Sequence, residues 1–198
     1  MATALFIGTF DPLHGGHIGQ LLRAHRAVSL TKVVILVNKD TSHKPLASSW
    51  RHRLNMATLT LEAFDLPFRY EVLATEDSLE PQTDETIDYK IIGIDSFISD
   101  INDASRWHYI KKWPLIVLSI PNIDSTLLTQ ALQSAPDTLR TSLRYTYVDE
   151  ARAPMMNYDF EQKAFSTHRV HATHLRSGEK QTFIPPAVQE YIRSHKLY

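Results

Sequence analysis

The amino-acid sequence predicts an α/β fold in which helices flank a parallel β-sheet. Short apolar runs alternate with longer amphipathic stretches along the chain, a pattern typical of strands joined by crossover helices. The chain has 198 residues, of which 43% are hydrophobic and 22% charged. That length suits about one domain, and that balance suits a globular protein with a buried core.

Each predicted element has its own sequence signal. Six segments are rich in the branched and aromatic residues that favour strands: residues 4–7, 32–37, 68–73, 89–94, 115–120 and 144–148. Three segments repeat apolar residues at helical spacing: residues 18–28, 49–64 and 185–195. The second of these helices opens on two serines, which suit an N-cap, and the third opens on two prolines, which suit a first helical turn.

Composition excludes several kinds of chemistry. The chain contains no cysteine, which rules out disulfides, cysteine-ligated metal sites and thiol nucleophiles. Lys and Arg number 21 against 22 Asp and Glu, a formal net charge of -1, so no field of the whole chain favours nucleic acid. No signal-peptide pattern is present, and the apolar runs are far shorter than the ~20 residues of a bilayer span. We expect a cytoplasmic protein without nucleic-acid or membrane partners.

The segment from Gly8 to His17, GTFDPLHGGH, lies between the first predicted strand and the first predicted helix. Loops at the carboxyl ends of parallel strands bind ligands, and glycines there let the backbone approach a phosphate. His14 and His17, three residues apart, are expected to face one phosphate beside the N–H groups of the helix start. Neither Walker A nor the dinucleotide GxGxxG pattern is present. The alternative interpretation of this pair is a surface turn with a helix cap.

This segment resembles the T/HxGH signature of the nucleotidyltransferase superfamily. It is also similar to the HIGH motif of class I aminoacyl-tRNA synthetases, but the chain is short for a synthetase and lacks a KMSKS-like segment. Five further features resemble those of bacterial nicotinate-nucleotide adenylyltransferases, in the same order. They are residues 42–45 with Arg53 and Met56 (PHK…R…M), residues 92–96 (IGxDS), Trp107, residues 170–176 (ISSTxIR), and the closing P–V–YI–LY pattern of residues 184–198.

The resemblance implies a Rossmann-like nucleotidylyl transferase fold, with one domain over residues 1–198 and a helical C-terminal portion at about 172–198. It implies transfer of AMP from ATP to nicotinate or nicotinamide mononucleotide in NAD biosynthesis, with release of pyrophosphate. Mg²⁺ is the expected cofactor, held mainly by the ATP phosphates, and no metal site of the protein's own is expected. The sequence leaves the oligomeric state open, a homo-oligomer included.

The resemblance also assigns residues to roles. His14, His17 and Arg176 are the expected catalytic residues, and Lys44 and Trp107 are expected to contact the acceptor. The residues expected to bind ATP are Gly8, Thr9, Phe10, Gly16, Gly93, Asp95 and Thr173. Four of these side chains also have plain structural interpretations: a loop lysine for Lys44, packing between helices for Trp107, a helix cap for Asp95 and a surface ion pair for Arg176.

Departures from the family pattern lie mainly at the acceptor end. The acidic stretch at residues 76–88 stands where the family has a YTxDTL helix, and residues 120–122 replace its RPG. Ile7 replaces a second glycine, and His171 with Ala172 replaces two serines near the ATP phosphates. Two alternatives therefore stay open: a related transferase with a phosphopantetheine or phospho-alcohol acceptor, and a non-catalytic nucleotide-binding homologue.

The histidines of the C-terminal region have competing interpretations. His171 and His174 either donate to phosphate in place of the lost serines or are ordinary exposed residues. A zinc site built from His168, His171 and His174 is disfavoured, because their spacing drifts around a helix and no carboxylate partner is evident.

Overall fold

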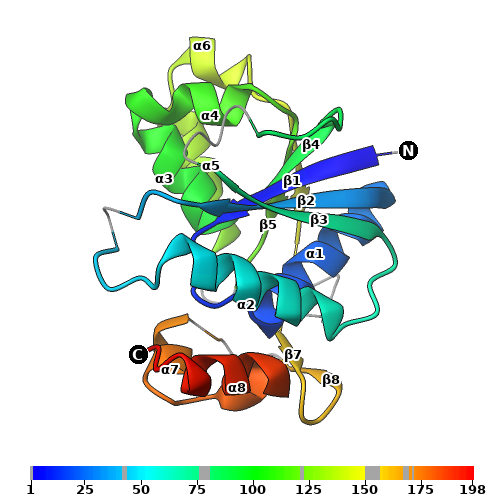
Figure 1. Cartoon of the computed structure of the whole chain (residues 1–198). Helices are drawn as coiled ribbons and strands as arrows, with labels where there is room; N and C mark the ends of the chain where they lie inside the picture. Colours follow the sequence, from blue (N-terminus) through cyan, green and yellow to red (C-terminus); the bar gives the residue numbers. More distant parts are fainter. Residues whose placement is uncertain are drawn as a thin grey trace.

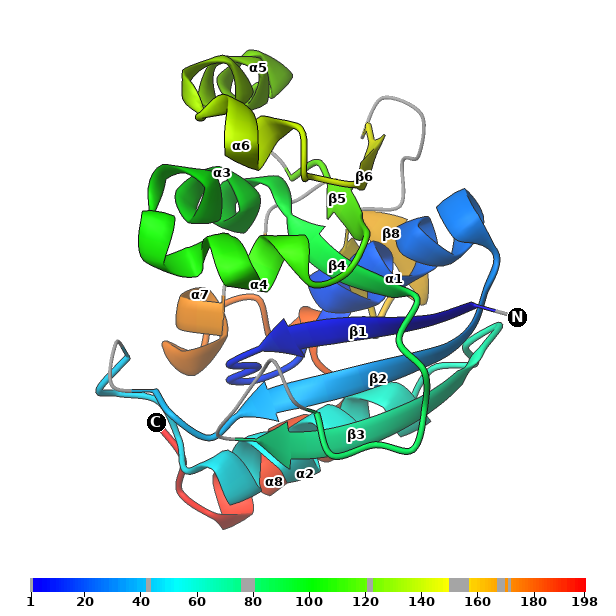
Figure 2. The same cartoon turned by 90° about the horizontal axis from the view of Figure 1, so that it is seen from above.

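The computed structural model describes residues 2–41, 44–75, 81–120, 123–149, 157–166, 170 and 172–198. Six parallel strands form one sheet in the order β3-β2-β1-β4-β5-β6 (Figures 1 and 2). Their bounds are Ala2–Gly8 (β1), Leu30–Asn38 (β2), Arg69–Thr75 (β3), Tyr89–Gly93 (β4), Leu115–Leu118 (β5) and Tyr145–Val148 (β6). All six strands match predicted segments, and the predicted fold class is confirmed.

Helices cover both faces of the sheet. On one face lie α1 (Gly15–Val28) and α2 (Trp50–Glu62); on the other lie α3 (Ile94–Asn102), α4 (Trp107–Lys111) and α5 (Ser125–Ser134), with the short α6 (Asp137–Arg140) (Figures 1 and 2). The sequence predicted α1 and α2 and, in the cap interpretation of Asp95, a helix near α3; it did not predict α4 to α6. Among the helices that the structure describes, none is long and apolar enough to cross a bilayer.

The C-terminal region lies under α1 and α2 (Figure 1). It contains an antiparallel hairpin of β7 (Asn157–Asp159) and β8 (Ala164–Ser166), followed by α7 (Ala172–Arg176), a 3₁₀ turn (Gln181–Phe183) and α8 (Pro186–Ser194). Met56 of α2 packs in one buried cluster with Val188 of α8. That contact ties the end of the chain to the helix that follows the second strand.

The central strands are buried on both faces, as apolar runs in parallel sheets are expected to be. Val33 to Val37 of β2 are fully buried, and side chains from alternate positions join different clusters. Phe6 of β1 packs with α1 residues such as Leu21, while Ile92 of β4 packs with Phe97 of α3.

The strand order also locates the site. The chain runs outward from β1 through β2 to β3, and then returns to place β4 on the other side of β1. The carboxyl ends of β1 and β4 are therefore a topological switch point, where open α/β sheets bind ligands.

Candidate functional site

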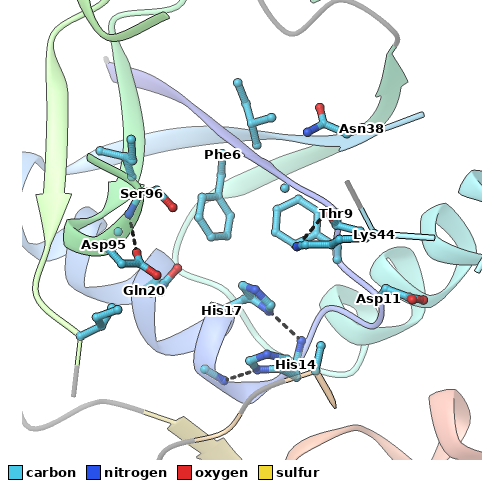
Figure 3. Close-up of a pocket in the computed structure, with 18 of the residues that line it drawn as sticks. Phe6, Thr9, Asp11, His14, His17, Gln20, Asn38, Lys44, Asp95 and Ser96 are labelled. Atoms are coloured by element: carbon cyan, nitrogen blue, oxygen red, sulfur yellow. Dashed lines mark hydrogen bonds between the residues drawn. The ribbon is translucent and has the colours of Figure 1, made fainter. Parts of the chain in front are cut away.

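A cavity of about 940 Å³ opens at the carboxyl ends of the central strands. Gly8 closes β1 and Gly93 closes β4, and both line it. The loop after β1, the start of α1, residues 44–47, the start of α3 and α7 supply other parts of the lining (Figure 3). Every site residue predicted from the sequence lines this cavity except Trp107.

The two histidines of the motif cap α1 reciprocally. His14 is the N-cap residue, and its Nδ1 accepts a hydrogen bond from the Gly16 backbone N–H at 3.1 Å. The His17 Nδ1 accepts one from the His14 backbone N–H, also at 3.1 Å (Figure 3). The helix-cap interpretation is therefore correct for His14. The same residue also lines the cavity, so the two roles are compatible. A neutral ring that accepts at Nδ1 carries its proton on Nε2, so the cap orients both rings as donors through Nε2.

His17 is neutral in this environment. Its ring lies edge-on to Phe10 at 5.1 Å and to Phe6 at 6.0 Å between centroids. Burial, and to a smaller extent the positive charge of Lys44, together lower the pKa of His17 to about 3. At neutral pH His17 therefore acts as a hydrogen-bond donor without carrying a charge.

A pH titration by NMR checks this assignment. We expect the His17 ring signals of the free protein to show no midpoint between pH 5 and 8, and a midpoint at 6–7 would contradict the burial argument. The unfolded chain binds this proton near pH 6.5, but the native chain binds it only near pH 3. This group therefore lowers the free energy of unfolding progressively as the pH falls from about 6.5 to 3, and has no such effect above 6.5.

Close backbone packing explains the glycine pair between the histidines. A Cβ on Gly15 would lie 1.8 Å from the Tyr158 carbonyl oxygen of β7. A Cβ on Gly16 would lie 2.5 Å from the Asn157 side chain and 2.9 Å from the His14 ring. The hairpin thus presses on the first turn of α1, and only glycines leave room for it.

A buried network holds the loop between β1 and α1. The fully buried Arg53 of α2 donates to the Thr9 carbonyl oxygen at 2.6 Å and to the Ser48 carbonyl oxygen at 2.8 Å. The buried carboxylate of Asp11 accepts from the Ser48 backbone N–H at 3.1 Å and from the Tyr198 hydroxyl. The last residue of the chain is thus bonded directly to the motif.

Two cationic side chains approach the motif from different elements. Lys44 Nζ donates to the Thr9 hydroxyl at 3.2 Å (Figure 3). Arg176 of α7 donates to the Asp11 carbonyl oxygen at 3.0 Å, lies 3.7 Å from its carboxylate, and reaches the Thr173 hydroxyl at 3.4 Å. Arg176 does form an ion pair, but its partner is the buried Asp11 of the motif, so the pair does not lie at the surface as that interpretation predicted. Histidine donors and two cations in one polar cavity are suited to binding phosphate groups.

Comparison with known proteins agrees with this geometry. The cytidylyltransferase-like family matches residues 5–176. The chain belongs to this family.

Relatives of this cytidylyltransferase-like chain cover it almost end to end. A probable nicotinate-nucleotide adenylyltransferase of Yersinia enterocolitica is 30% identical over 217 residues, which is 98% of this chain and 94% of that protein. One of Pectobacterium atrosepticum is 28% identical over 211 residues, covering 99% and 98%. The Plasmodium falciparum nicotinic acid mononucleotide adenylyltransferase has the same fold. Its complex with NaAD matches with a TM-score of 0.66 and its complex with APC with 0.64, each at 15% identity over 100% of this chain.

Trp107 lies apart from the cavity of this family member. Its indole N–H donates to the Ile101 carbonyl oxygen at 3.0 Å, and its ring packs on the cluster between α3, α4 and β5. Trp107 therefore packs between helices, and the proposed site does not include this residue. Tyr109, two residues later, lines the cavity instead. Asp95 also lines it, but the helix-cap interpretation of this residue is wrong: Gly93 is the N-cap residue of α3 and no side chain caps that helix, while the Asp95 carboxylate accepts from the adjacent Ser96 backbone N–H at 2.7 Å.

Some predicted features fall outside the described residues. His168 and His171 do, as do residues 42–43 of the PHK-like stretch, residues 76–80 of the acidic stretch and residues 121–122. His174 is partly buried and does not line the cavity. Within the described ranges, no three His, Asp or Glu side chains gather as a metal site requires.

Four residues of the site had no role in the sequence-based prediction. Asp11, Arg53 and Tyr198 stood inside quoted motifs, but their mutual contacts join parts of the chain up to 187 residues apart. The signal for Lys90 was a charged residue inside an apolar strand, YKIIG. Lysine side chains are almost never fully buried unless they are paired with another group.

Proposed function

We propose that this chain is an adenylyltransferase that transfers AMP from ATP to the phosphate of nicotinate or nicotinamide mononucleotide, with release of pyrophosphate, in NAD biosynthesis. The observation that carries the proposal is the reciprocal histidine cap, which occupies the Nδ1 atoms of two rings in a cavity that Lys44 and Arg176 also line. Full-length similarity to probable nicotinate-nucleotide adenylyltransferases supports the choice of acceptor.

The reaction needs little covalent chemistry from the protein. An oxygen of the acceptor phosphate attacks the α-phosphorus of ATP, and the bond to the bridging oxygen breaks as pyrophosphate leaves with the electron pair. The attacking phosphate is an anion at neutral pH, so no general base is required. Catalysis then consists of aligning the two phosphates and stabilising charge on the transferred group.

Residues of the motif loop and of neighbouring elements contact different phosphate groups in this proposal. His17, neutral and oriented through its Nδ1 bond, donates to an oxygen of the α-phosphate, and His14 donates beside it. Lys44 anchors the incoming acceptor phosphate as a point charge, and Arg176 with Thr173 holds the β- and γ-phosphates of ATP. Gly8, Gly16 and Gly93, with Thr9 and Phe10, line the cavity, and in this proposal ATP lies against them.

Mg²⁺ fits this site as a companion of ATP. Asp11 is buried and its carboxylate already accepts hydrogen bonds, whereas Asp95 faces the cavity with one oxygen engaged by Ser96. Asp95 would hold the ion, directly or through water, or bind the ATP ribose. Bound Mg²⁺ neutralises negative charge on the phosphates of ATP.

Pyrophosphate release tests the proposal. The protein, ATP and Mg²⁺ are incubated in turn with nicotinate mononucleotide, nicotinamide mononucleotide, phosphopantetheine and a simple phospho-alcohol, and products are identified by mass. We expect a pyridine dinucleotide. Turnover with phosphopantetheine or the phospho-alcohol alone would instead assign another acceptor, and tight ATP binding without any product would indicate a non-catalytic homologue.

A further inference from the structure

Asp11, in the loop between β1 and α1, is a buried anion with an exposed fraction of 2% (Figure 3). One of its carboxylate oxygens, Oδ1, accepts from the Tyr198 hydroxyl, and the other, Oδ2, accepts from the Ser48 backbone N–H at 3.1 Å. Both oxygens therefore have neutral donors, although the cations Arg53 and Arg176 lie nearby.

Arg176 lies beside this carboxylate without donating to it. Its Nη1 is 3.7 Å from Asp11 Oδ2, which is too long for a hydrogen bond, and donates instead to the Asp11 backbone carbonyl oxygen at 3.0 Å. Its Nη2 reaches the Thr173 hydroxyl at 3.4 Å. A guanidinium has five N–H donors, and these contacts leave some of them for a ligand in the cavity that Arg176 lines.

Tyr198 is close to both charged groups. Its ring centroid lies 5.9 Å from the Arg176 guanidinium. Burial, and the hydrogen bond to Asp11, raise the pKa of the Tyr198 hydroxyl, so it remains a donor at neutral pH. If this donor were removed, a buried carboxylate oxygen would lose its partner, and a direct pair with Arg176 would offset that cost. Arginine and carboxylate groups readily form such pairs with two parallel hydrogen bonds.

We propose that Tyr198 is a positioning residue for ATP, because its hydroxyl occupies the Asp11 carboxylate and thereby keeps Arg176 available for phosphate. This role rests on the proposed function, which assigns Arg176 to the β- and γ-phosphates, and goes beyond it by naming the group that holds the arginine in place. Asp11 and the phosphates compete for one guanidinium, and the Tyr198 hydroxyl favours the phosphates. No bond of the reaction forms or breaks at the tyrosine.

The first test is the substitution Tyr198→Phe, which removes the hydroxyl and keeps the ring beside Arg176. Tyr198 is 47% exposed, so we expect the variant to fold. Calorimetry measures the binding of ATP and of AMP, which lacks the β- and γ-phosphates. We expect the Kd for ATP to rise at least ~5-fold through the loss of charge-assisted contacts, while the Kd for AMP stays within about twofold. An unchanged Kd for ATP, or an equal loss for both nucleotides, would overturn the inference.

Tyr191→Phe is the matched control. The Tyr191 hydroxyl also joins the C-terminal region to α2, since it accepts from the Asn55 side chain at 2.9 Å and lies 3.0 Å from His52 Nδ1. Tyr191 does not line the cavity, so this variant should change neither Kd. If it raised the Kd for ATP as much as Tyr198→Phe does, the effect would come from looser packing of α8 and the positioning role would be refuted.

A double-mutant cycle with Asp11→Asn isolates the effect of the charge. Asparagine keeps the shape of the side chain but carries no negative charge, so it does not draw Arg176 away from ATP. Tyr198→Phe should therefore change the Kd for ATP less than about twofold when Asp11 is already replaced. Equal losses in both backgrounds would contradict the competition between Asp11 and the phosphates.

These binding measurements also separate the positioning role from the proposed function. If the wild type binds ATP but makes no product with any acceptor, the proposed function fails, while the Kd values still decide the role of Tyr198. If the wild type does not bind ATP, both are overturned.

Discussion

Replacing His17 with alanine is expected to lower kcat at least ~10²-fold while leaving KM for ATP within a few-fold. The ring is held by its Nδ1 bond to the His14 backbone, so its Nε2 donor has a fixed orientation, and the proposed function assigns that donor to the transferred phosphate. A donor of this kind contributes mainly in the transition state, where charge on the phosphoryl oxygens is redistributed. Because burial keeps the pKa of His17 at about 3, the loss should be similar across pH 6–8.

The variant also removes part of the α1 cap, so stability must be measured beside activity. His25→Ala provides a matched control on the same helix: its Nδ1 lies 2.8 Å from the Leu30 carbonyl oxygen, and its side chain does not line the cavity. We expect wild-type kcat from it. An unchanged kcat in the His17 variant would remove this residue from the mechanism.

Replacing Arg53 with methionine is expected to lower the free energy of unfolding by about 3 kcal/mol. The guanidinium is fully buried and satisfies the carbonyl oxygens of Thr9 and Ser48. It also carries charge near the buried Asp11 carboxylate. Methionine fills much of the same volume, so the loss measures the missing hydrogen bonds and charge more than a cavity.

Urea denaturation gives this number, and the matched control is Arg51→Met on the same helix. Arg51 is exposed and lies over the Trp50 ring, so its loss should change the unfolding free energy by less than about 0.5 kcal/mol. Since Arg53 also holds the loop that carries Thr9, we expect kcat/KM to fall at least ~10-fold. A stable variant with wild-type kinetics would show that the loop keeps its shape without this residue.

Local sequence patterns were sufficient to predict an element whose structure depends mainly on its own residues. The run KVVILV predicts a central strand because both faces of a parallel strand are apolar, and it lies within β2. The start of α3 was misplaced, because the chain passes from strand to helix at Gly93 with no polar linker between them, whereas the cap interpretation of Asp95 placed the helix after that residue. The hairpin of β7 and β8 escaped prediction for another reason: its strands are three residues each, too short for a periodic signal.

The residues of the candidate site also divide into those that a local motif predicts and those that depend on contacts with distant parts of the chain. The motif from Gly8 to His17 placed both histidines correctly, because a strand, a glycine-containing loop and a helix start are contiguous in sequence. Trp107 could not be placed that way, since its ring direction depends on the packing of α3 against α4. The roles of Arg53 and Tyr198 depended on contacts with a loop far away in the chain.

The sequence alone therefore determined the alternation of strands and helices, the position of the histidine-containing loop between β1 and α1, and the family. These properties are encoded in periodicity and in short motifs, which need no knowledge of distant contacts. Only the tertiary structure decided that His17 is neutral, that the last residue of the chain holds Asp11, and that Lys90 is a buried cation beside Arg106. Burial and charge pairing depend on what surrounds a side chain, and the fold alone sets those surroundings.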